Sequence, residues 1–366
     1  MKLTIFTAAL ILGGTERISA NLANELVKKG YEVEFLTLFH VDKPAYPLDS
    51  RIKIVELLHD AGRSGSRLYD IYKHIRRYLA LIKYTRASDT DKYLVMLPLP
   101  VLMLLSLKGV TFNVPVIFSE RDDPKTTFAT SRTKCFFSKF LLKKADGAIF
   151  QTTDAEQTYR GVIKRKRQII LNPVSEELLA AVGNKLSESE KTFICVGRLT
   201  RQKNQKLLIE AFSTIHTKIP AYKLKFIGEG ADLNMLQDLC CQRGIENKVV
   251  FTGKLSHYEQ IYKKGDIFVL SSLHEGLPNA LIEAMVMGLP CIASDCPCGG
   301  PRMLIDHGVN GLLYSVNNVG QLAECMLHLA TQPSLAEKIG EKAADLKEKV
   351  APEKIFCQWI DFIVKI

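Results

Sequence analysis

Short apolar runs alternate with longer segments of helical periodicity along most of the chain. Apolar runs bounded by Gly, Pro and polar residues indicate buried strands, and apolar residues three or four apart indicate helices that cover them. Strands that alternate with helices predict parallel sheets with helices packed on them. The expected strands comprise residues 3–7, 33–38, 52–57, 114–118, 148–152, 169–171, 193–196, 223–226, 249–251, 267–270 and 291–294.

The alternation is interrupted after Asn172-Pro173, where a polar segment lacks a strong strand pattern. We therefore predict two Rossmann-like α/β domains, residues 1–175 and residues 176–349. Residues 350–366 are expected to form a last helix that packs back on the first domain. Its apolar face would consist of Ile355, Trp359, Phe362 and Ile363.

Residues 68–86 have the period of an amphipathic helix with a basic side. The apolar side is expected to pack on the core, and the alternative is that the helix meets a membrane, with its basic side against lipid headgroups. The apolar positions are Leu68, Ile71, Tyr72, Ile75, Leu79 and Ile82, and the basic positions are Lys73, Arg76, Arg77 and Lys83.

The positive charge of the chain is concentrated in its first half. Residues 1–180 contain 28 Lys and Arg against 19 Asp and Glu, a net charge of +9, and the formal net charge of all 366 residues is +10. This excess favours an anionic partner for the first domain, such as membrane lipid, nucleic acid or a diphosphate lipid. A solvated basic surface without a partner is the alternative.

Composition favours a cytosolic protein. The nine cysteines lack both the spacing of a disulfide framework and that of zinc ligands, so we expect reduced thiols. No window reaches the roughly 18–20 apolar residues that span a bilayer. The apolar start of the chain is interpreted as a strand and not as a signal peptide, because a helix pattern follows Gly13-Gly14 at once.

The stretch from residue 265 to residue 305 is expected to carry the chemistry. A buried strand is followed by a polar loop with Glu275, and Pro278 then begins a helix that contains Glu283 and ends at Gly288. Ligands of parallel α/β sheets bind at the carboxyl ends of the strands. A loop carboxylate there can accept hydrogen bonds from sugar hydroxyls, a helix carboxylate can accept from a ribose diol, and the helix N-terminus attracts phosphate. The arrangement predicts a site for a nucleotide-sugar.

A second loop supplies two cations. Arg198 follows the strand of residues 193–196, and Lys203 lies five residues further on. A nucleoside diphosphate gains negative charge as it leaves a sugar, and two fixed cations can stabilise that charge without a metal. We therefore predict that Arg198 and Lys203 bind the diphosphate.

The two glutamates and the Gly-Leu-Pro between them resemble the E-x7-E signature of the retaining glycosyltransferases of family four. The resemblance covers nearly the whole chain and implies the GT-B fold, with two Rossmann-like domains facing a cleft and a last helix that crosses back to the first. It implies that Arg198 and Lys203 hold the diphosphate, that Glu275 orients the sugar and that Glu283 binds ribose. Glu275, Arg198 and Lys203 are the expected catalytic residues. Since the family does not require a metal and we identify no Asp-x-Asp stretch as a metal site, we expect no metal and no cofactor.

The resemblance also assigns loop residues. On the acceptor side it points to the paired glycines before the first helix and to Ser119-Glu120-Arg121, where relatives carry Ser-Glu-His or Ser-Glu-Arg. Donor contacts are expected from the glycine loops of the second domain. The acceptor-side residues are Gly13, Thr15, Glu120 and Arg121, and the further donor-binding residues are Gly14, Gly228, Gly253, Gly276, Leu277, Gly299 and Gly300.

The expected reaction is transfer, with retention, of a hexose or N-acetylhexosamine from a nucleotide-sugar, UDP-sugar in preference to GDP-sugar. The expected acceptor is a sugar hydroxyl of a growing, polyprenyl-diphosphate-linked glycan such as a capsule, O-antigen or lipopolysaccharide. The enzyme would lie on the cytoplasmic face of a bacterial inner membrane.

Three alternatives differ from this interpretation. A nucleotide-sugar epimerase of the same fold would act without an acceptor. A basic nucleic-acid-binding protein would bind in a salt-sensitive way, but the aromatic and basic platforms of such proteins are not evident. A nicotinamide-dependent oxidoreductase is disfavoured because Gly13-Gly14 is not part of a G-x-G-x-x-G fingerprint.

Overall fold

The computed structural model describes residues 1–11, 13–58, 67–121, 124, 132–182, 191–255 and 257–366. The chain divides into two compact units. Unit 1 comprises residues 1–171 and 355–366, and unit 2 comprises residues 172–354. The polar segment that follows Asn172-Pro173, near the predicted boundary between residues 175 and 176, lies partly outside the described residues.

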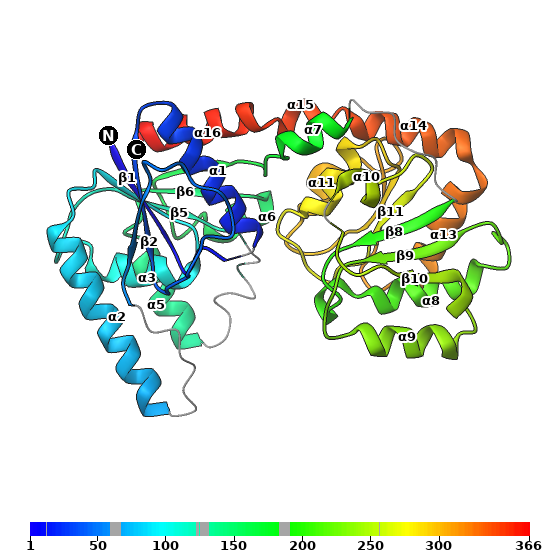
Figure 1. Cartoon of the computed structure of the whole chain (residues 1–366), viewed down its shortest axis with the longest axis horizontal. Helices are drawn as coiled ribbons and strands as arrows, with labels where there is room; N and C mark the ends of the chain where they lie inside the picture. The colour runs from blue at the N-terminus through cyan, green and yellow to red at the C-terminus, as the bar shows by residue number, and fades with distance from the viewer. Residues whose placement is uncertain (12, 59–66, 122–123, 125–131, 183–190, 256) are drawn as a thin grey trace. The chain divides into compact units, whose positions relative to one another are not determined.

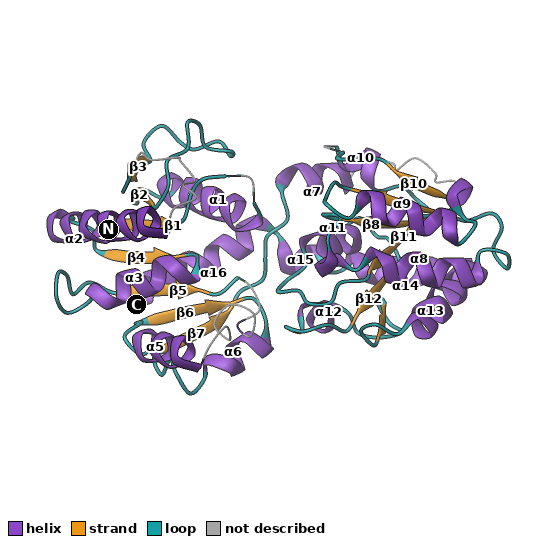
Figure 2. Cartoon of the chain, turned by 90° about the horizontal axis from the view of Figure 1, so that it is seen from below, coloured by secondary structure: helices purple, strands orange, loops and turns teal. Residues whose placement is uncertain are grey.

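Unit 1 (Figure 1) is built on a seven-stranded parallel sheet with the order β3-β2-β1-β4-β5-β6-β7, which Figure 2 shows strand by strand. From β1 the chain first builds toward one edge and then returns to add β4 on the other side of β1, which makes β1 and β4 a topological switch point. The strands are β1 (Lys2–Thr7), β2 (Glu32–Thr37), β3 (Lys53–Glu56), β4 (Lys92–Val95), β5 (Val116–Ser119), β6 (Gly147–Phe150) and β7 (Lys166–Ile169).

One face of this sheet is covered by α1 (Gly14–Lys28) and by the last helix, α16 (Pro352–Lys365). Leu22 and Leu26 of α1 and Trp359 of α16 belong to one buried apolar cluster with residues of the strands. The expectation that the last helix packs on the first domain is therefore confirmed.

The other face is covered by three helices, α2 (Arg67–Ala87), α3 (Pro98–Leu107) and α5 (Arg132–Leu142) (Figure 2). The sequence analysis did not predict α3, because its ten residues are almost uniformly apolar and lack an amphipathic period. The helix α6 (Thr153–Tyr159) joins β6 to β7.

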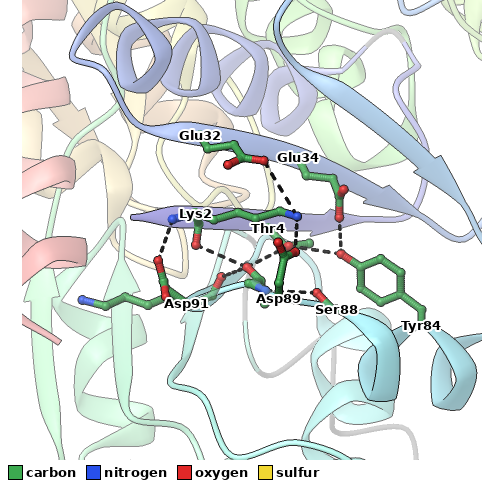
Figure 3. A network of polar contacts seen from close by, with 10 residues as sticks. Lys2, Thr4, Glu32, Glu34, Tyr84, Ser88, Asp89 and Asp91 are labelled. Atoms are coloured by element: carbon green, nitrogen blue, oxygen red, sulfur yellow. Dashed lines mark hydrogen bonds and ion pairs between the residues drawn. The ribbon is translucent and has the colours of Figure 1, made fainter.

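The carboxyl-terminal half of α2 is fixed by a network of polar contacts with β1 and β2 (Figure 3). The Tyr84 hydroxyl donates a hydrogen bond to the carboxylate of Glu34, and it also contacts the hydroxyl of Thr4 at 3.1 Å. Thr4 in turn donates to Thr90 at 3.0 Å. Burial, together with the Glu34 carboxylate, raises the pKa of Tyr84, so this phenol stays a neutral donor.

The expected orientation of α2 is wrong. Ile71, Ile75 and Leu79 are 52–58% exposed. The opposite side of the helix, which carries Lys73, faces inward, and Lys73 is 3% exposed. The contacts of Tyr84 and the burial of Leu81 decide which side of the helix faces the sheet. The amino-terminal half of α2 extends beyond the strands of the sheet (Figure 1). The side chain of Leu68 lies outside the described part of the chain.

Unit 2 repeats the architecture with a six-stranded parallel sheet in the order β10-β9-β8-β11-β12-β13. Its switch point lies between β8 and β11. The strands are β8 (Thr192–Val196), β9 (Lys223–Ile227), β10 (Val249–Phe251), β11 (Ile267–Leu270), β12 (Cys291–Ser294) and β13 (Leu312–Tyr314). Both units thus have the Rossmann-like architecture that the sequence predicts.

The helices of unit 2 cover both faces of its sheet (Figure 1). Residues of β8, α8, β9 and α13 form one continuous buried cluster. The helices are α7 (Glu176–Val182), α8 (Gln205–Ile215), α9 (Leu233–Gln242), α10 (Tyr258–Ile261), α11 (Asn279–Val286), α12 (Gly300–Leu304), α13 (Val319–Thr331), α14 (Pro333–Ala344) and α15 (Lys347–Val350), with short 3-10 turns at Arg201–Lys203 and Glu246–Lys248.

Candidate functional site

The switch point of unit 2 brings two predicted site residues into direct contact. The Nζ atom of Lys203, in the loop after β8, lies 2.6 Å from Oε1 of Glu275, in the loop after β11. The two side chains are 17% and 10% exposed. A carboxylate this buried is stable as an anion only with a cation or hydrogen-bond donors beside it, and Lys203 supplies both.

The carboxylate of Glu275 is also positioned by a serine that the sequence analysis missed. The hydroxyl of Ser272 donates to Oε1 of Glu275 at 2.6 Å, so Lys203 and Ser272 converge on the same oxygen. The hydroxyl of Ser294, at the end of β12, donates to the carbonyl of Ser272 at 2.7 Å. The available signal was the pair Ser271-Ser272 directly after an apolar strand, where a hydroxyl reaches the strand-end edge of the sheet.

Backbone contacts join the loop of Glu275 to its neighbours. The amide of Glu275 donates to the carbonyl of Pro297 at 2.6 Å, and the amide of Cys298 donates to the carbonyl of Glu275 at 2.7 Å. On the other side, the hydroxyl of Ser271 donates to the carbonyl of Lys203 at 2.7 Å. Three loops from separate strands therefore act as one scaffold for the ion pair.

Close packing explains the glycines of this scaffold. A Cβ atom on Gly300 would lie 1.8 Å from the carbonyl oxygen of Gly276, so only glycine fits at position 300. Gly299 caps α12 with a φ of +80°. Leu277 is buried, and its carbonyl accepts from the Asn172 side chain at 3.5 Å, while that amide also donates to Asn279 at 2.7 Å. The structure thus brings together the predicted residues 276, 277, 299 and 300.

A second group of glycines joins the loops after β8, β9 and β10. Gly228 has a φ of +141°, and a Cβ atom there would lie 2.1 Å from the carbonyl oxygen of Gly197. The amide of Gly228 donates to the carbonyl of Gly253 at 2.9 Å. Packing therefore requires glycine at position 228, and a φ of +69° favours glycine at position 253, whatever these residues do for a ligand.

Arg198 differs from Lys203 because its side chain is exposed. Its carbonyl accepts from the side chain of Gln205 at 2.8 Å, and the next amide, that of Leu199, donates to the carbonyl of Glu229 at 2.9 Å. The backbone is therefore held on both sides while the guanidinium is accessible to an anion.

Glu283 lies in α11 and is half-buried. The hydroxyl of Tyr262 donates to its Oε2 at 3.2 Å. Burial raises the pKa of Tyr262 well above its ordinary value, and the Glu283 carboxylate adds to this effect. Tyr262 was not identified from the sequence, where it is one tyrosine among twelve.

The thiols around the ion pair are inert. All nine cysteines are free thiols. Burial raises the pKa of Cys195 to about 12, although nearby Lys203 opposes this shift, and burial has the same effect on Cys296. A protonated, buried thiol is a poor nucleophile and a poor metal ligand, so we assign these residues no chemistry.

In unit 1 the predicted acceptor-side residues form a second cluster. Glu120 is 1% exposed, and its Oε2 accepts from the hydroxyl of Tyr159 at 2.6 Å. Its Oε1 accepts from the amide of Arg121 at 3.1 Å. The guanidinium of Arg121 lies over the ring of Trp359, 5.8 Å from the centroid. Burial lowers the pKa of Arg121 to about 10, while the carboxylates of Glu120 and Glu16 oppose that shift.

The loop with the paired glycines approaches this cluster through Glu16. Gly13 caps α1, and a Cβ atom there would lie 2.2 Å from Oε2 of Glu16. The carbonyl of Gly13 accepts from the hydroxyl of Tyr46 at 3.0 Å. Gly14 and Thr15 form the first turn of α1. Glu16 and Tyr46 were not among the predicted residues.

The chain does contain an Asp-x-Asp stretch, and its surroundings do not resemble a ligand site. The stretch Asp89-Thr90-Asp91 does have Asp-x-Asp spacing. However, Asp91 accepts from the backbone amide of Lys2 at 2.7 Å and Asp89 pairs with the ammonium of Lys2 (Figure 3). Both aspartates lie at the amino ends of β1 and β4, at the edge opposite to the strand ends where ligands of such sheets bind.

Comparisons with known proteins extend over the whole chain. Residues 180–346 match the family model described as glycosyl transferases group 1. A glycosyltransferase of Haemophilus influenzae is 30% identical over 348 residues, which cover 95% of each chain. The GalNAc-α-(1→4)-GalNAc-α-(1→3)-diNAcBac-PP-undecaprenol α-1,4-N-acetyl-D-galactosaminyltransferase of Campylobacter jejuni is 24% identical over 369 residues, which cover 100% of this chain and 99% of that one.

Solved structures agree with the fold. The Anabaena protein HepE, crystallised in complex with UDP, superposes with a TM-score of 0.78 and 15% identity, and the match covers 100% of both chains. This similarity confirms the GT-B fold that the sequence predicts.

Proposed function

Because the chain belongs to the glycosyl transferases group 1 family, and is therefore a glycosyltransferase, we propose that the Lys203–Glu275 pair is the centre of its donor site. The observation that carries the proposal is the 2.6 Å contact between the two side chains at the switch point of unit 2. In the proposed reaction a hexose or N-acetylhexosamine moves, with retention, from a UDP-sugar to a hydroxyl of a lipid-linked glycan.

The diphosphate of the donor binds to Lys203 and Arg198. A lysine ammonium has three N–H donors, so Lys203 keeps its hydrogen bond to Glu275 and donates to a phosphate oxygen as well. The exposed Arg198 guanidinium adds a planar pair of donors that matches a phosphate. These two fixed cations balance the charge of the leaving diphosphate, which is why we propose that the reaction needs no metal.

The sugar is oriented by Glu275. Its Oε1 is occupied by Lys203 and Ser272, so the sugar hydroxyls are received at Oε2. One oxygen of Glu283 accepts from Tyr262, and the carboxylate binds the ribose diol. As the bond between C1 and the phosphate oxygen breaks, its electron pair leaves with the diphosphate. The acceptor hydroxyl attacks C1 on the same face, and its proton passes to the leaving phosphate oxygen.

The assignments of donor and acceptor rest on the relatives. HepE was crystallised with UDP, which supports a uridine donor, and the name of the Campylobacter enzyme specifies an undecaprenyl-diphosphate-linked acceptor. We propose the same acceptor class here, in the synthesis of a surface polysaccharide such as capsule, O-antigen or lipopolysaccharide. The enzyme would then work on the cytoplasmic face of a membrane. Among the described residues, none of the helices has the length and hydropathy required to cross a bilayer.

A donor screen tests the proposal. The purified full chain is mixed with UDP- and GDP-sugars in the presence of EDTA, and melting temperature and released nucleoside diphosphate are measured together. We expect stabilisation by one UDP-sugar and slow release of UDP. Stabilisation only after a divalent metal is added would contradict metal independence. Conversion of the donor sugar without an acceptor would indicate an epimerase, and salt-sensitive binding to nucleic acid alone would indicate a nucleic-acid-binding protein.

A further inference from the structure

Large exposed apolar side chains in unit 1 gather on α2 and α5. Five of them follow one side of α2, and three phenylalanines, each at least 56% exposed, lie on α5. Isolated exposed apolar residues are common, but groups of this size mark interaction surfaces. We call this group the outward α2–α5 surface; it consists of Tyr69, Ile71, Tyr72, Ile75, Leu79, Phe136, Phe137 and Phe140.

The outward side of α2 is apolar although the inward side contains cations. Lys73 is buried, and its Nζ atom lies 4.5 Å from the centroid of the Tyr69 ring. Arg77 lies over the ring of Phe39 at the same distance. Ile71, Ile75 and Leu79 thus remain in contact with water in the isolated chain, which is unfavourable for aliphatic side chains and points to an apolar partner for the outward side.

The two helices are fixed on the same face of the sheet, with α3 between them (Figure 2). Tyr78 of α2 and Ser106 of α3 are joined by a hydrogen bond of 2.7 Å. Lys108, which follows α3, donates to the carbonyl of Lys144, beyond the end of α5, at 3.0 Å. With the network around Tyr84 (Figure 3), these contacts fix the carboxyl-terminal half of α2 and the end of α5 relative to the sheet.

The charges beside this surface are almost all positive. The sequence of α2 contains six Lys and Arg against a single acid, Asp70, and that of α5 contains three Lys and Arg and no acid. Arg76, Lys83 and Lys139 are exposed beside the apolar side chains. Aromatic and aliphatic side chains flanked by exposed cations are typical of protein surfaces that lie in the interface of an anionic bilayer.

We propose that the outward α2–α5 surface docks the enzyme on an anionic lipid bilayer, with its apolar side chains inserted between the headgroups. The proposal deepens the proposed function, since a lipid-linked acceptor lies in such a bilayer, but the docking itself does not depend on the donor chemistry. A second copy of the chain is a less suitable occupant, because cations would then face like cations. Nucleic acid would pair with the cations and leave Ile71, Ile75 and Leu79 in water.

The test is binding of the full chain to vesicles, measured by co-sedimentation. We compare vesicles of phosphatidylcholine alone with vesicles that also contain phosphatidylglycerol. The test variant carries Ile75→Ser and Leu79→Ser, and the matched control carries Met235→Ser and Val309→Ser, which are similarly exposed in unit 2. We expect binding only to the anionic vesicles and a loss of affinity of roughly tenfold or more in the test variant, with no change in the control, because burial of each aliphatic side chain contributes to binding.

The outcomes separate the docking proposal from the proposed function. Release of UDP from the donor sugar is measured in the same samples without vesicles, and the test variant should retain it. Absence of vesicle binding, or equal binding by both variants, would overturn the docking proposal even when UDP release is normal. A wild-type dimer that the test variant converts to a monomer would instead assign the surface to self-association, and binding to duplex DNA with none to vesicles would assign it to nucleic acid.

Discussion

Two carboxylates follow strand ends in the two units, and their surroundings differ. In unit 2, Glu275 is held through one oxygen by a lysine and a serine. In unit 1, Glu120 receives hydrogen bonds at both oxygens, from the Tyr159 hydroxyl and from a backbone amide. A carboxylate that accepts hydrogen bonds at only one oxygen can still bind a ligand through the other. The lysine beside it has further N–H donors that can contact the same ligand. A buried carboxylate whose two oxygens both accept hydrogen bonds from the protein acts first as part of the fold. This contrast supports the role that we propose for Glu275 and favours a structural role for Glu120.

The largest effect is expected at Glu275. The substitution Glu275→Gln keeps the shape of the side chain but removes the charge that orients the sugar and balances Lys203. We expect kcat to fall by about 10²–10³, the usual loss when a charged group at the transition state is removed. Steady-state release of UDP with and without acceptor measures this loss. The melting temperature should fall as well, because Lys203 loses the carboxylate of a largely buried ion pair, so kcat is compared at a temperature at which both proteins are folded. Unchanged kcat would remove Glu275 from the site.

A smaller effect is expected at the serine beside it. Ser272→Ala leaves Lys203 on Glu275 but removes one of the two donors to Oε1. Loss of one such hydrogen bond costs about 1 kcal/mol, which corresponds to a decrease of roughly fivefold in kcat. Ser272 is a positioning residue, so Ser272→Thr, which keeps the hydroxyl, should recover part of the rate. Equal rates for both substitutions would contradict this role.

The corresponding change in unit 1 should affect stability and not rate. Tyr159→Phe removes the hydroxyl that donates to Glu120 and leaves a buried carboxylate oxygen without that donor. The free energy of unfolding should fall by about 1–3 kcal/mol. Urea denaturation of wild type and variant measures the difference. If kcat for UDP release falls tenfold while stability is unchanged, the contrast between the two carboxylates is wrong.

The smallest effect concerns pH. Burial raises the pKa of Glu16 above its ordinary value, while nearby Arg121 opposes the shift. A carboxyl with a raised folded pKa binds more protons in the folded state, so its contribution to stability falls as pH rises through that range. Glu16→Gln should therefore increase the melting temperature slightly at pH 7, and the difference from wild type should disappear as the pH falls below about 4, where the carboxyl is protonated in both states. A difference that grows on acidification would contradict this interpretation.

The sequence predicted a parallel sheet in each unit, although it missed β4, and it placed candidate site residues in the loops after β8 and β11. Apolar runs set the strands, and β11 and β12 have the expected bounds, because a strand buried on both faces has a nearly continuous apolar sequence. The spacing of Glu275 and Glu283 around a helix start was equally readable. These features depend on residues that are neighbours in the sequence.

Features that depend on contacts between distant residues could not be predicted. The pairing of Lys203 with Glu275 joins residues 72 positions apart, and nothing in the sequence says which donor reaches Oε1. The orientation of α2 was predicted wrongly because its apolar period was taken as its buried side. The side that packs is instead selected by Tyr84 of the helix and its contact with Glu34 of strand β2.

The central claim is that Lys203 binds the donor diphosphate while it holds Glu275. Isothermal titration of UDP into the wild type, Lys203→Ala and the control Lys206→Ala, which removes an exposed lysine three residues away, tests it with EDTA present. A charge-assisted hydrogen bond contributes about 1.5–3 kcal/mol, so Kd should rise by roughly 10- to 100-fold in Lys203→Ala and stay unchanged in Lys206→Ala. Equal Kd values for all three proteins would contradict the account, because the cation beside Glu275 would then have no part in binding the diphosphate.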